Sequence, residues 1–298
     1  MRNQPKSGPG YRSRGLLAAL LLSATMTTSA NDCPQPRIGL ALGSGGAGGL
    51  AHIAMLSVFE ELEIEPAAIA GTSIGAVIGA LHAAGLESGE IRELFREFGG
   101  SALDPLSGLL SKGGPPGLRD LVRVDLTAGS VLDARRFIEF IADRFEARAF
   151  AELEKPLAVV ATDYWNGDPV VLRDGDLLEA IRASMAVPGL FAPVAHGDQL
   201  LIDGGTSDPL PVNSLRDVDF IVAIDVTGTR QQKRDGSPHL TDLLFNTFEI
   251  MQQSILRARL EQDRPDILIK PELPGIRLLH FDRVDRIIDG AAPAANEL

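Results

Sequence analysis

The chain has 298 residues, of which 45% are hydrophobic, and it carries 28 Lys and Arg against 40 Asp and Glu, a net charge of −12. A chain of this length and composition buries one large core and does not need a second domain. Because no run of Lys and Arg appears, the charge argues against nucleic acid as a partner and against binding to an anionic membrane through a basic patch. The single cysteine, Cys33, excludes an internal disulfide.

The first 30 residues differ in composition from the rest of the chain. They contain four basic residues and no acidic one, then the apolar run GLLAALLLSATM, then small residues up to Ala30. This order is typical of a secretory signal peptide, here with cleavage after Ala30. A signal-anchor helix is the alternative, but the apolar run is shorter than the roughly 20 residues that span a bilayer. We therefore expect a signal peptide at 1–30, a single domain at 31–298, and a secreted or periplasmic protein.

Strand, glycine turn and helix then follow one another twice. The apolar run 37–42 predicts a buried strand, and apolar residues from Leu50 recur at helical spacing. A second strand at 67–70, a turn at 71–75 and a helix closed by Gly85 repeat this order. The alternation predicts an α/β fold, with a mainly parallel central sheet covered by helices and ligand sites at the carboxyl ends of the strands.

Residues 99–131 interrupt this order, because they mix Gly and Pro with scattered leucines. They are either an irregular surface segment or an apolar cap over the site. The following sequence predicts helices over 133–145 and 177–186, strands over 157–163, 199–203 and 220–226, and a hairpin near Asp174 and Gly175. A helical pattern over 240–260 has one apolar face, which we interpret as core packing rather than as a membrane-binding face. That face is formed by Leu244, Phe248, Met251 and Ile255.

The sequence Gly71-Thr72-Ser73-Ile74-Gly75 is a G-x-S-x-G motif between a predicted strand and a predicted helix. In this setting the glycines permit a sharp turn in which Cβ atoms would collide, and the turn exposes the serine hydroxyl at the head of the sheet. The start of the helix also favours negative charge near Ser73. We predict that Ser73 is a nucleophile and that Gly71 and Gly75 form the nucleophile elbow.

A serine nucleophile needs a base. Three of the five histidines lie in predicted helices or on a hydrophilic tip: His52, His82 and His196. Only His239 and His280 come late enough in the chain for the Ser, Asp, His order of an α/β-hydrolase triad. Asp203 is a different candidate, because it ends the apolar run QLLID and precedes two glycines, so a strand delivers it at its end.

The glycine-rich segment ALGSGGAGGLAH, residues 41–52, has two interpretations. Gly43-x-Gly45-x-x-Gly48 matches a dinucleotide fingerprint. A loop that presents N–H groups to a reacting carbonyl would instead be half of an oxyanion hole. A dinucleotide site needs a ribose-binding acid at the end of the second strand, where this chain has Gly71. We therefore favour the oxyanion hole.

Four segments in order, LALGSGGAGGLAHI, GTSIG, ASMAVPGLFAPV and DGG, resemble the patatin-like phospholipases. The resemblance extends from about Ile38 to the C-terminus. It implies a three-layer patatin-like fold and a Ser-Asp dyad without histidine, in which Ser73 is the nucleophile and Asp203 the base. It also implies an oxyanion hole formed by Gly43, Ser44, Gly45 and Gly46. The chain departs from the family's usual loop at two positions, because Ser44 stands at a glycine position and Gly48 replaces a basic residue.

The resemblance implies a lipid acyl hydrolase that cleaves esters of phospholipids or lysophospholipids through an acyl-enzyme. We expect it to contact a membrane or micelle surface through apolar residues and to use no cofactor and no metal, since the chain has no His-x-x-x-His, Cys pair or EF-hand loop. Two alternatives stay open. One is an α/β-hydrolase esterase with a Ser-Asp-His triad, and the other is a non-catalytic lipid-binding relative.

Overall fold

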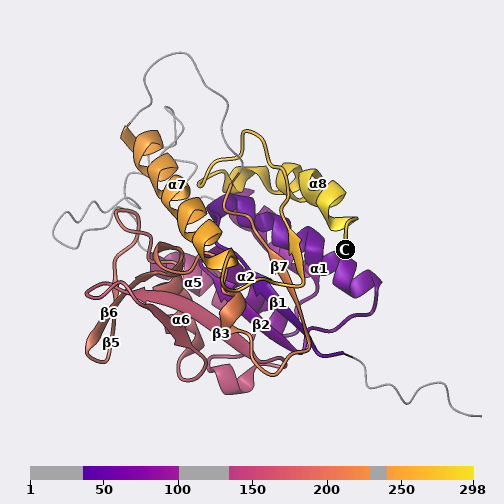
Figure 1. The fold of residues 1–298 in the computed structure, drawn as a ribbon, viewed down its shortest axis with the longest axis horizontal. Helices are drawn as coiled ribbons and strands as arrows, with labels where there is room; N and C mark the ends of the chain where they lie inside the picture. The colour runs from indigo at the N-terminus through magenta and orange to yellow at the C-terminus, as the bar shows by residue number, and fades with distance from the viewer. Residues whose placement is uncertain (1–35, 101–133, 229–239) are drawn as a thin grey trace, which may run out of the picture. The chain divides into compact units, whose positions relative to one another are not determined.

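The structure, a computed structural model, describes residues 36–100, 134–228 and 240–298. The predicted signal peptide, Cys33, almost all of the predicted cap and His239 lie outside these residues. The described residues from Pro36 onward belong to one compact unit (Figure 1). Its strands are β1 Ile38–Leu42, β2 Ala68–Thr72, β3 Leu157–Asp163, β4 Pro169–Leu172, β5 Val194–His196, β6 Gln199–Asp203, β7 Phe220–Ile224 and β8 Ile267–Ile269. Its helices are α1 Ala51–Glu61, α2 Ile74–Ala83, α3 Ser88–Gly100, α5 Ala134–Ala142, α6 Leu177–Ser184, α7 Leu240–Leu260 and α8 Val284–Ala295.

These strands form one mixed, mostly parallel sheet in the order β5-β6-β3-β2-β1-β7-β8, with β4 also paired to β3. The pairs β1–β2, β2–β3, β1–β7 and β7–β8 are parallel. The strands β4 and β6 run antiparallel to β3, and β5 runs antiparallel to β6. This topology confirms the predicted α/β fold with a mainly parallel central sheet.

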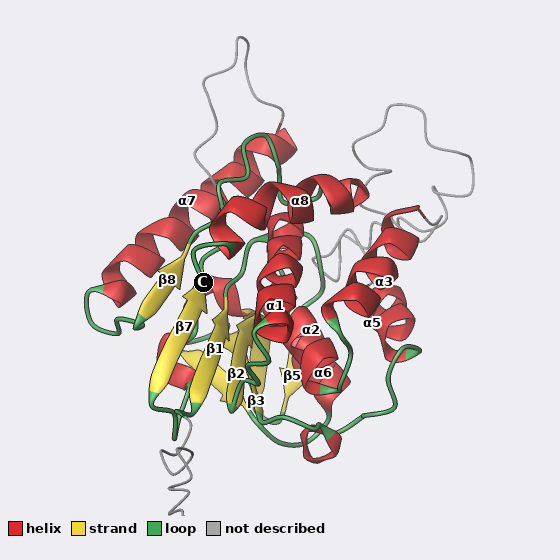
Figure 2. Cartoon of the chain, turned by 90° about the vertical axis from the view of Figure 1, so that its right-hand side faces the viewer, coloured by secondary structure: helices red, strands yellow, loops and turns green. Residues whose placement is uncertain are grey.

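The two faces of the sheet carry different side chains, as the period-2 alternation of a strand requires. Leu40 and Leu42 of β1 belong to a large core cluster with residues of α1, α2 and α8, which cover one face (Figure 2). Ala41 between them belongs to a second cluster on the other face, which includes Leu256 of α7. Because alanine is small, the elements on this second face approach the central strands closely.

Most of the predicted elements form with small shifts of their bounds. The strands predicted at 157–163 and 199–203 and the helix at 240–260 have the predicted bounds. The predicted hairpin is misplaced, since its turn lies between β3 and β4, and Asp174 and Gly175 form the turn before α6. The helices α3 and α8 and the short strands β5 and β8 were not predicted.

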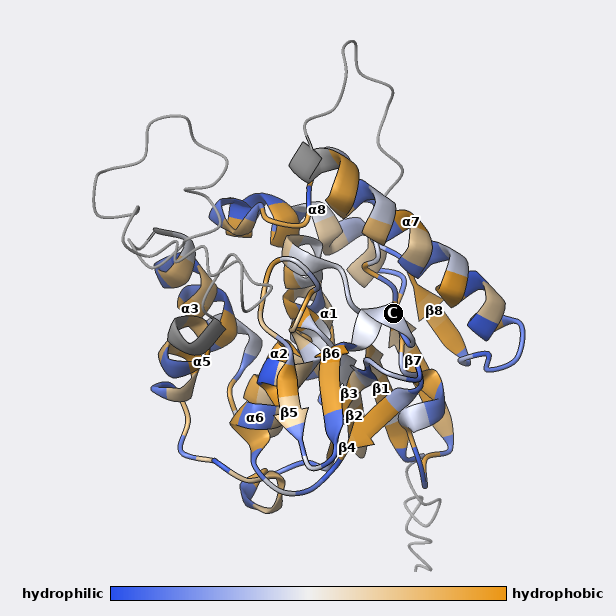
Figure 3. Ribbon diagram, turned by 90° about the vertical axis from the view of Figure 1, so that its left-hand side faces the viewer, coloured by the Kyte–Doolittle hydropathy of each residue, from blue (hydrophilic) through white to orange (hydrophobic). Residues whose placement is uncertain are grey.

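The interpretation of α7 as a core-packing helix is wrong for half of its predicted face. Phe248 packs against the core, whereas Leu244 is 60% and Met251 is 52% exposed. Leu243 and Ile250 are also exposed, so apolar side chains recur on the outer side of the helix. Figure 3 shows the hydrophobic and hydrophilic residues that alternate along α7. The helix is apolar on two sides, and the sequence pattern alone does not distinguish them.

Candidate active site

Ser73 occupies the sharp turn between β2 and α2, at the carboxyl end of the central strands. Its backbone has φ 57° and ψ −121°, a conformation that non-glycine residues rarely adopt. A Cβ at Gly71 would lie 2.5 Å from the Gly75 carbonyl oxygen, and one at Gly75 would overlap the backbone at Leu42. Both glycines are therefore required by the close approach of the backbone, as the elbow motif predicts.

Two hydroxyl groups, those of Ser184 and Thr72, hydrogen-bond this turn to neighbouring segments. The Ser73 amide donates to Ser184 Oγ at 2.8 Å, and Ser184 Oγ donates to the Val160 carbonyl at 2.6 Å. On the other side, Thr72 Oγ1 donates to the Asp208 carbonyl at 2.9 Å. Ser184 thus ties the end of α6 to both the elbow and β3, which the sequence analysis did not foresee.

The register of β3 brings the ends of β2 and β6 together. Thr72 pairs with Val160, and Asp203 pairs with the next residue, Ala161. Because β4 pairs with both Val160 and Ala161, it takes one edge of β3, and β2 and β6 must share the other edge. The two strands run in opposite directions and meet at their carboxyl ends. Ser73, which follows Thr72 directly, therefore lies beside Asp203.

Asp203 is fully buried at this junction. Its Oδ1 accepts a hydrogen bond from the Gly205 amide at 2.8 Å, whereas its buried Oδ2 has no hydrogen-bond partner in the described part of the protein. Burial raises the pKa of Asp203 to about 7, against the opposing effects of the Ser73 side chain and the Gly205 amide. The Ser73 side chain therefore interacts with the carboxyl group without a hydrogen bond of ordinary geometry, as in many unliganded sites where such bonds tighten with substrate.

The glycine loop lies between the end of β1 and the short 3₁₀ helix Gly46–Leu50. The Gly43 amide donates to the Ile224 carbonyl at 3.1 Å, and the Ser44 amide donates to the Pro209 carbonyl at 2.8 Å. Four residues were predicted for the oxyanion hole, and the amides of the first two already donate to these carbonyls. The amides of Gly45 and Gly46 have no hydrogen-bond partner among the described residues. The first amides of α2, at Ile74 and Gly75, are likewise unpaired there.

His52 supports the glycine loop from α1. It is fully buried, and its Nε2 lies 2.9 Å from the Gly43 carbonyl oxygen. Burial lowers the pKa of His52 to about 4, so the ring is neutral at pH 7 and its Nε2 carries the proton that the carbonyl accepts. The sequence places this residue only in a predicted helix. The structure adds a specific contact with the glycine loop.

The remaining described histidines are not bonded to the elbow. His280 Nδ1 accepts a hydrogen bond from the Arg277 amide at 3.0 Å, and exposed His196 faces Glu179. No hydrogen bond joins a histidine to Ser73 or Asp203 within the described ranges. The same part of the chain holds no cluster of three or more His, Cys, Asp or Glu suited to a metal, and no helix in it is long and apolar enough to cross a membrane.

A family model for patatin-like phospholipases matches residues 40–216, which include the glycine loop, the elbow and Asp203. The chain belongs to the patatin-like phospholipase family. An uncharacterized NTE family protein of Mycobacterium tuberculosis is 34% identical over 210 residues, covering 70% of this chain and 54% of that protein. Patatin-like phospholipase domain-containing protein 6 of Mus musculus is 32% identical over 212 residues, covering 69% of this chain and 14% of that protein. The chain thus matches about half the length of its mycobacterial relatives and less of the mouse one.

The solved structures to which this chain is similar include two bacterial proteins. VipD from Legionella pneumophila has a TM-score of 0.48 at 15% identity, with 89% of this chain and 67% of that chain covered. ExoU from Pseudomonas aeruginosa, in complex with SpcU, has a TM-score of 0.36 at 16% identity, with 87% and 53% covered.

Proposed function

We propose that this patatin-like chain is a serine lipid acyl hydrolase that cleaves acyl esters of phospholipids or lysophospholipids through Ser73 and Asp203. The observation that carries the proposal is the shared edge of β3, which sets the strained serine beside a buried carboxyl group. A base whose pKa is about 7 suits proton transfer at neutral pH better than an ordinary aspartate does.

In the first half-reaction, Ser73 Oγ attacks the ester carbonyl carbon while Asp203 Oδ2 takes the hydroxyl proton. The carbonyl oxygen becomes an oxyanion, and the unpaired amides of Gly45 and Gly46 are the donors available to it. When the tetrahedral intermediate collapses, the bond to the alcohol oxygen breaks and Asp203 returns the proton to that oxygen. The acyl group remains on Ser73 as an ester.

In the second half-reaction, water attacks the acyl-enzyme with Asp203 again as the base. The proton then passes from Asp203 to Ser73 Oγ as the acyl bond breaks, and the fatty acid leaves. No step requires a histidine or a metal ion.

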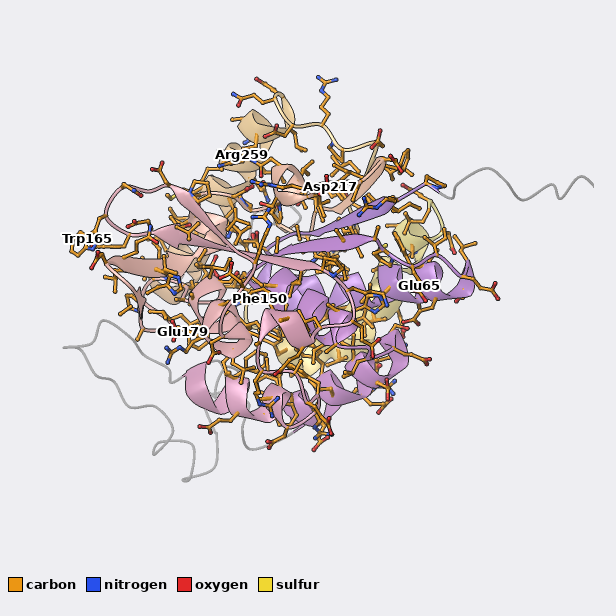
Figure 4. All side chains as sticks on the ribbon, turned by 90° about the horizontal axis from the view of Figure 1, so that it is seen from below. Glu65, Phe150, Trp165, Glu179, Asp217 and Arg259 are labelled. Atoms are coloured by element: carbon orange, nitrogen blue, oxygen red, sulfur yellow. The ribbon has the colours of Figure 1, made fainter. Side chains whose placement is uncertain are left out.

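The substrate is an aggregated lipid, and exposed apolar side chains support contact with its surface. The stripe on α7, formed by Leu243, Leu244, Ile250 and Met251, begins at the helix N-terminus. A second exposed apolar pair, Tyr164 and Trp165, follows the carboxyl end of β3, and Trp165 projects away from the ribbon (Figure 4). Tryptophan and tyrosine suit the polar–apolar boundary of a lipid surface.

A fluorophosphonate probe, followed by mass mapping of the modified peptide, tests the nucleophile. We expect the label on Ser73 and none on Ser73→Ala, together with release of fatty acid from phosphatidylcholine or lysophosphatidylcholine by the wild type alone. Binding of these lipids without labelling or fatty-acid release would support a non-catalytic lipid-binding protein.

The compartment is a separate part of the proposal, namely that the protein is secreted or periplasmic after loss of residues 1–30. We expect the protein isolated from its native cells to begin near Asn31. An intact mass that still includes residues 1–30 would contradict this.

A further inference from the structure

Three side chains from distant parts of the sequence converge on Gly205, the residue whose amide holds Asp203. A Cβ at Gly205 would lie 2.9 Å from both Asp203 Oδ1 and Ser44 Oγ, and it would overlap the amide nitrogen Nε2 of Gln252. Ser44 comes from the glycine loop and Gln252 from α7. Gln252 is 2% exposed although its neighbour Met251 is 52% exposed, so its side chain points inward from the helix.

Each of these residues has a buried oxygen with no hydrogen-bond partner from the described protein. The three atoms are Ser44 Oγ, Gln252 Oε1 and Asp203 Oδ2. Ser44 is 1% exposed and Asp203 is fully buried, so bulk solvent does not reach them. Buried polar groups in native proteins are nearly always paired, commonly with an ordered water that bonds to two to four of them.

We propose that Ser44, Gln252 and Asp203 bind the water molecule that hydrolyses the acyl-enzyme, with Gln252 as its positioning residue. The inference rests on the proposed function. The water donates one hydrogen to Asp203 Oδ2 and the other to Gln252 Oε1, and it accepts the Ser44 hydroxyl proton in a hydrogen bond. One lone pair is left for attack on the acyl carbon.

The chemistry balances with these three contacts. The lone pair forms the new bond to the acyl carbon, and the proton that the water shares with Asp203 moves to Oδ2. The bond from the acyl carbon to Ser73 Oγ then breaks, and Asp203 gives the proton to that oxygen. Gln252 and Ser44 exchange no proton, so their contribution is the orientation of the water.

Separate rates for acylation and deacylation distinguish positioning of the water from general support of the fold. We would follow hydrolysis of p-nitrophenyl butyrate by stopped flow, in which the burst reports acylation and the steady state reports deacylation. For Gln252→Met, which keeps the size of the side chain but loses the amide oxygen, we expect deacylation to fall about 10- to 100-fold while the burst rate stays near that of the wild type. Intact mass should then show butyryl-enzyme during turnover.

Gln253→Met is the matched control, because the Gln253 amide donates instead to the carbonyls of Thr227 and Gly228. Ser44→Ala is the second variant, should Gln252→Met not fold, and we expect a smaller loss confined to deacylation. Unchanged deacylation in the folded variants, or equal loss in both half-reactions, would overturn the water site. A wild type that never forms acyl-Ser73 would instead refute the proposed function.

Discussion

The Ser184 hydroxyl bridges the Ser73 amide and the Val160 carbonyl, so one side chain bonds both the candidate nucleophile and the strand beside it. Ser184 itself is fully buried. Its hydroxyl is the link through which α6 holds the elbow in its strained conformation.

We expect Ser184→Ala to lose about 1–3 kcal/mol of unfolding free energy, because a buried amide and a buried carbonyl lose their partner. Acylation of Ser73 should fall as well, since the elbow is less firmly held. Urea unfolding and the burst rate measure the two effects. Ser254→Ala is the control, because that hydroxyl donates to Ile250 on the exposed side of α7, and a loss in this variant equal to that in Ser184→Ala would contradict the argument.

Asp203→Asn tests the base. The amide keeps the size of the carboxyl group but cannot take the proton, so we expect acyl transfer to fall about 10²- to 10⁴-fold. His239→Ala and His280→Ala should stay within severalfold of the wild type. Thermal melting must first show that each variant is folded. A hundredfold loss in a folded histidine variant would instead indicate the Ser-Asp-His triad.

The pKa of Asp203 predicts the pH dependence of activity. The residue is a base only when ionised, and burial raises its pKa to about 7. We therefore expect kcat/KM for a neutral ester to rise with pH and to level off above an apparent pKa near 7. A rate that is already level from pH 5 upward would mean that the base ionises in the ordinary aspartate range.

The same pKa predicts an effect of pH on stability. An unfolded aspartate has a pKa of about 4, so the folded state binds the proton on Asp203 more tightly than the unfolded state does. The free energy of unfolding that this proton contributes is therefore complete below about pH 4 and is lost as the pH rises through about 7. We expect the melting temperature of the wild type to fall relative to that of Asp203→Asn over this range. Asp208, whose pKa burial also raises to about 7, is present in both proteins, so the difference between them isolates Asp203.

Two glycines of the loop form a matched pair of variants. A Cβ at Gly45 would overlap the Val226 carbonyl, whereas one at Gly48 would lie 3.5 Å from the same oxygen, at ordinary contact distance. We expect Gly45→Ala to lower acylation about 10²- to 10³-fold by displacing the oxyanion donors, and Gly48→Ala to stay near the wild type. Equal rates for the two variants would argue against a role of this loop in acylation.

The apolar stripe on α7 predicts a preference for aggregated lipid. We expect the double variant Leu244→Ser, Met251→Ser to lose about 100-fold or more in activity on phosphatidylcholine vesicles and to keep its rate on dispersed p-nitrophenyl butyrate, because each side chain buried in lipid contributes about 1.5–3 kcal/mol. Leu62→Ser is the control, since Leu62 is similarly exposed, at 54%, just beyond the end of α1. An equal loss on both substrates would indicate damage to the site rather than to lipid contact.

Local sequence patterns predicted the elements that carry the candidate site. The elbow at Ser73 and the strand that ends at Asp203 follow from glycine positions and apolar runs, which are short-range features. The partners of these residues are long-range. Ser184, His52 and Gln252 reach the site through the packing of α6, α1 and α7, and no spacing in the sequence specifies such contacts. For His52 a local signal did exist in the sequence, because this residue lies in the first turn of the helix that follows the glycine loop.

The meeting of β2 and β6 along a single edge of β3 also governs when the chain becomes reactive. The strand that ends at Asp203 is synthesised long after the one that precedes Ser73, and the two meet only after β3 has paired with both. A nascent or partly refolded chain thus has the elbow serine without its base. Ester hydrolysis then reports the formation of a long-range contact in the sheet, and its recovery during refolding should lag behind the return of helical signal.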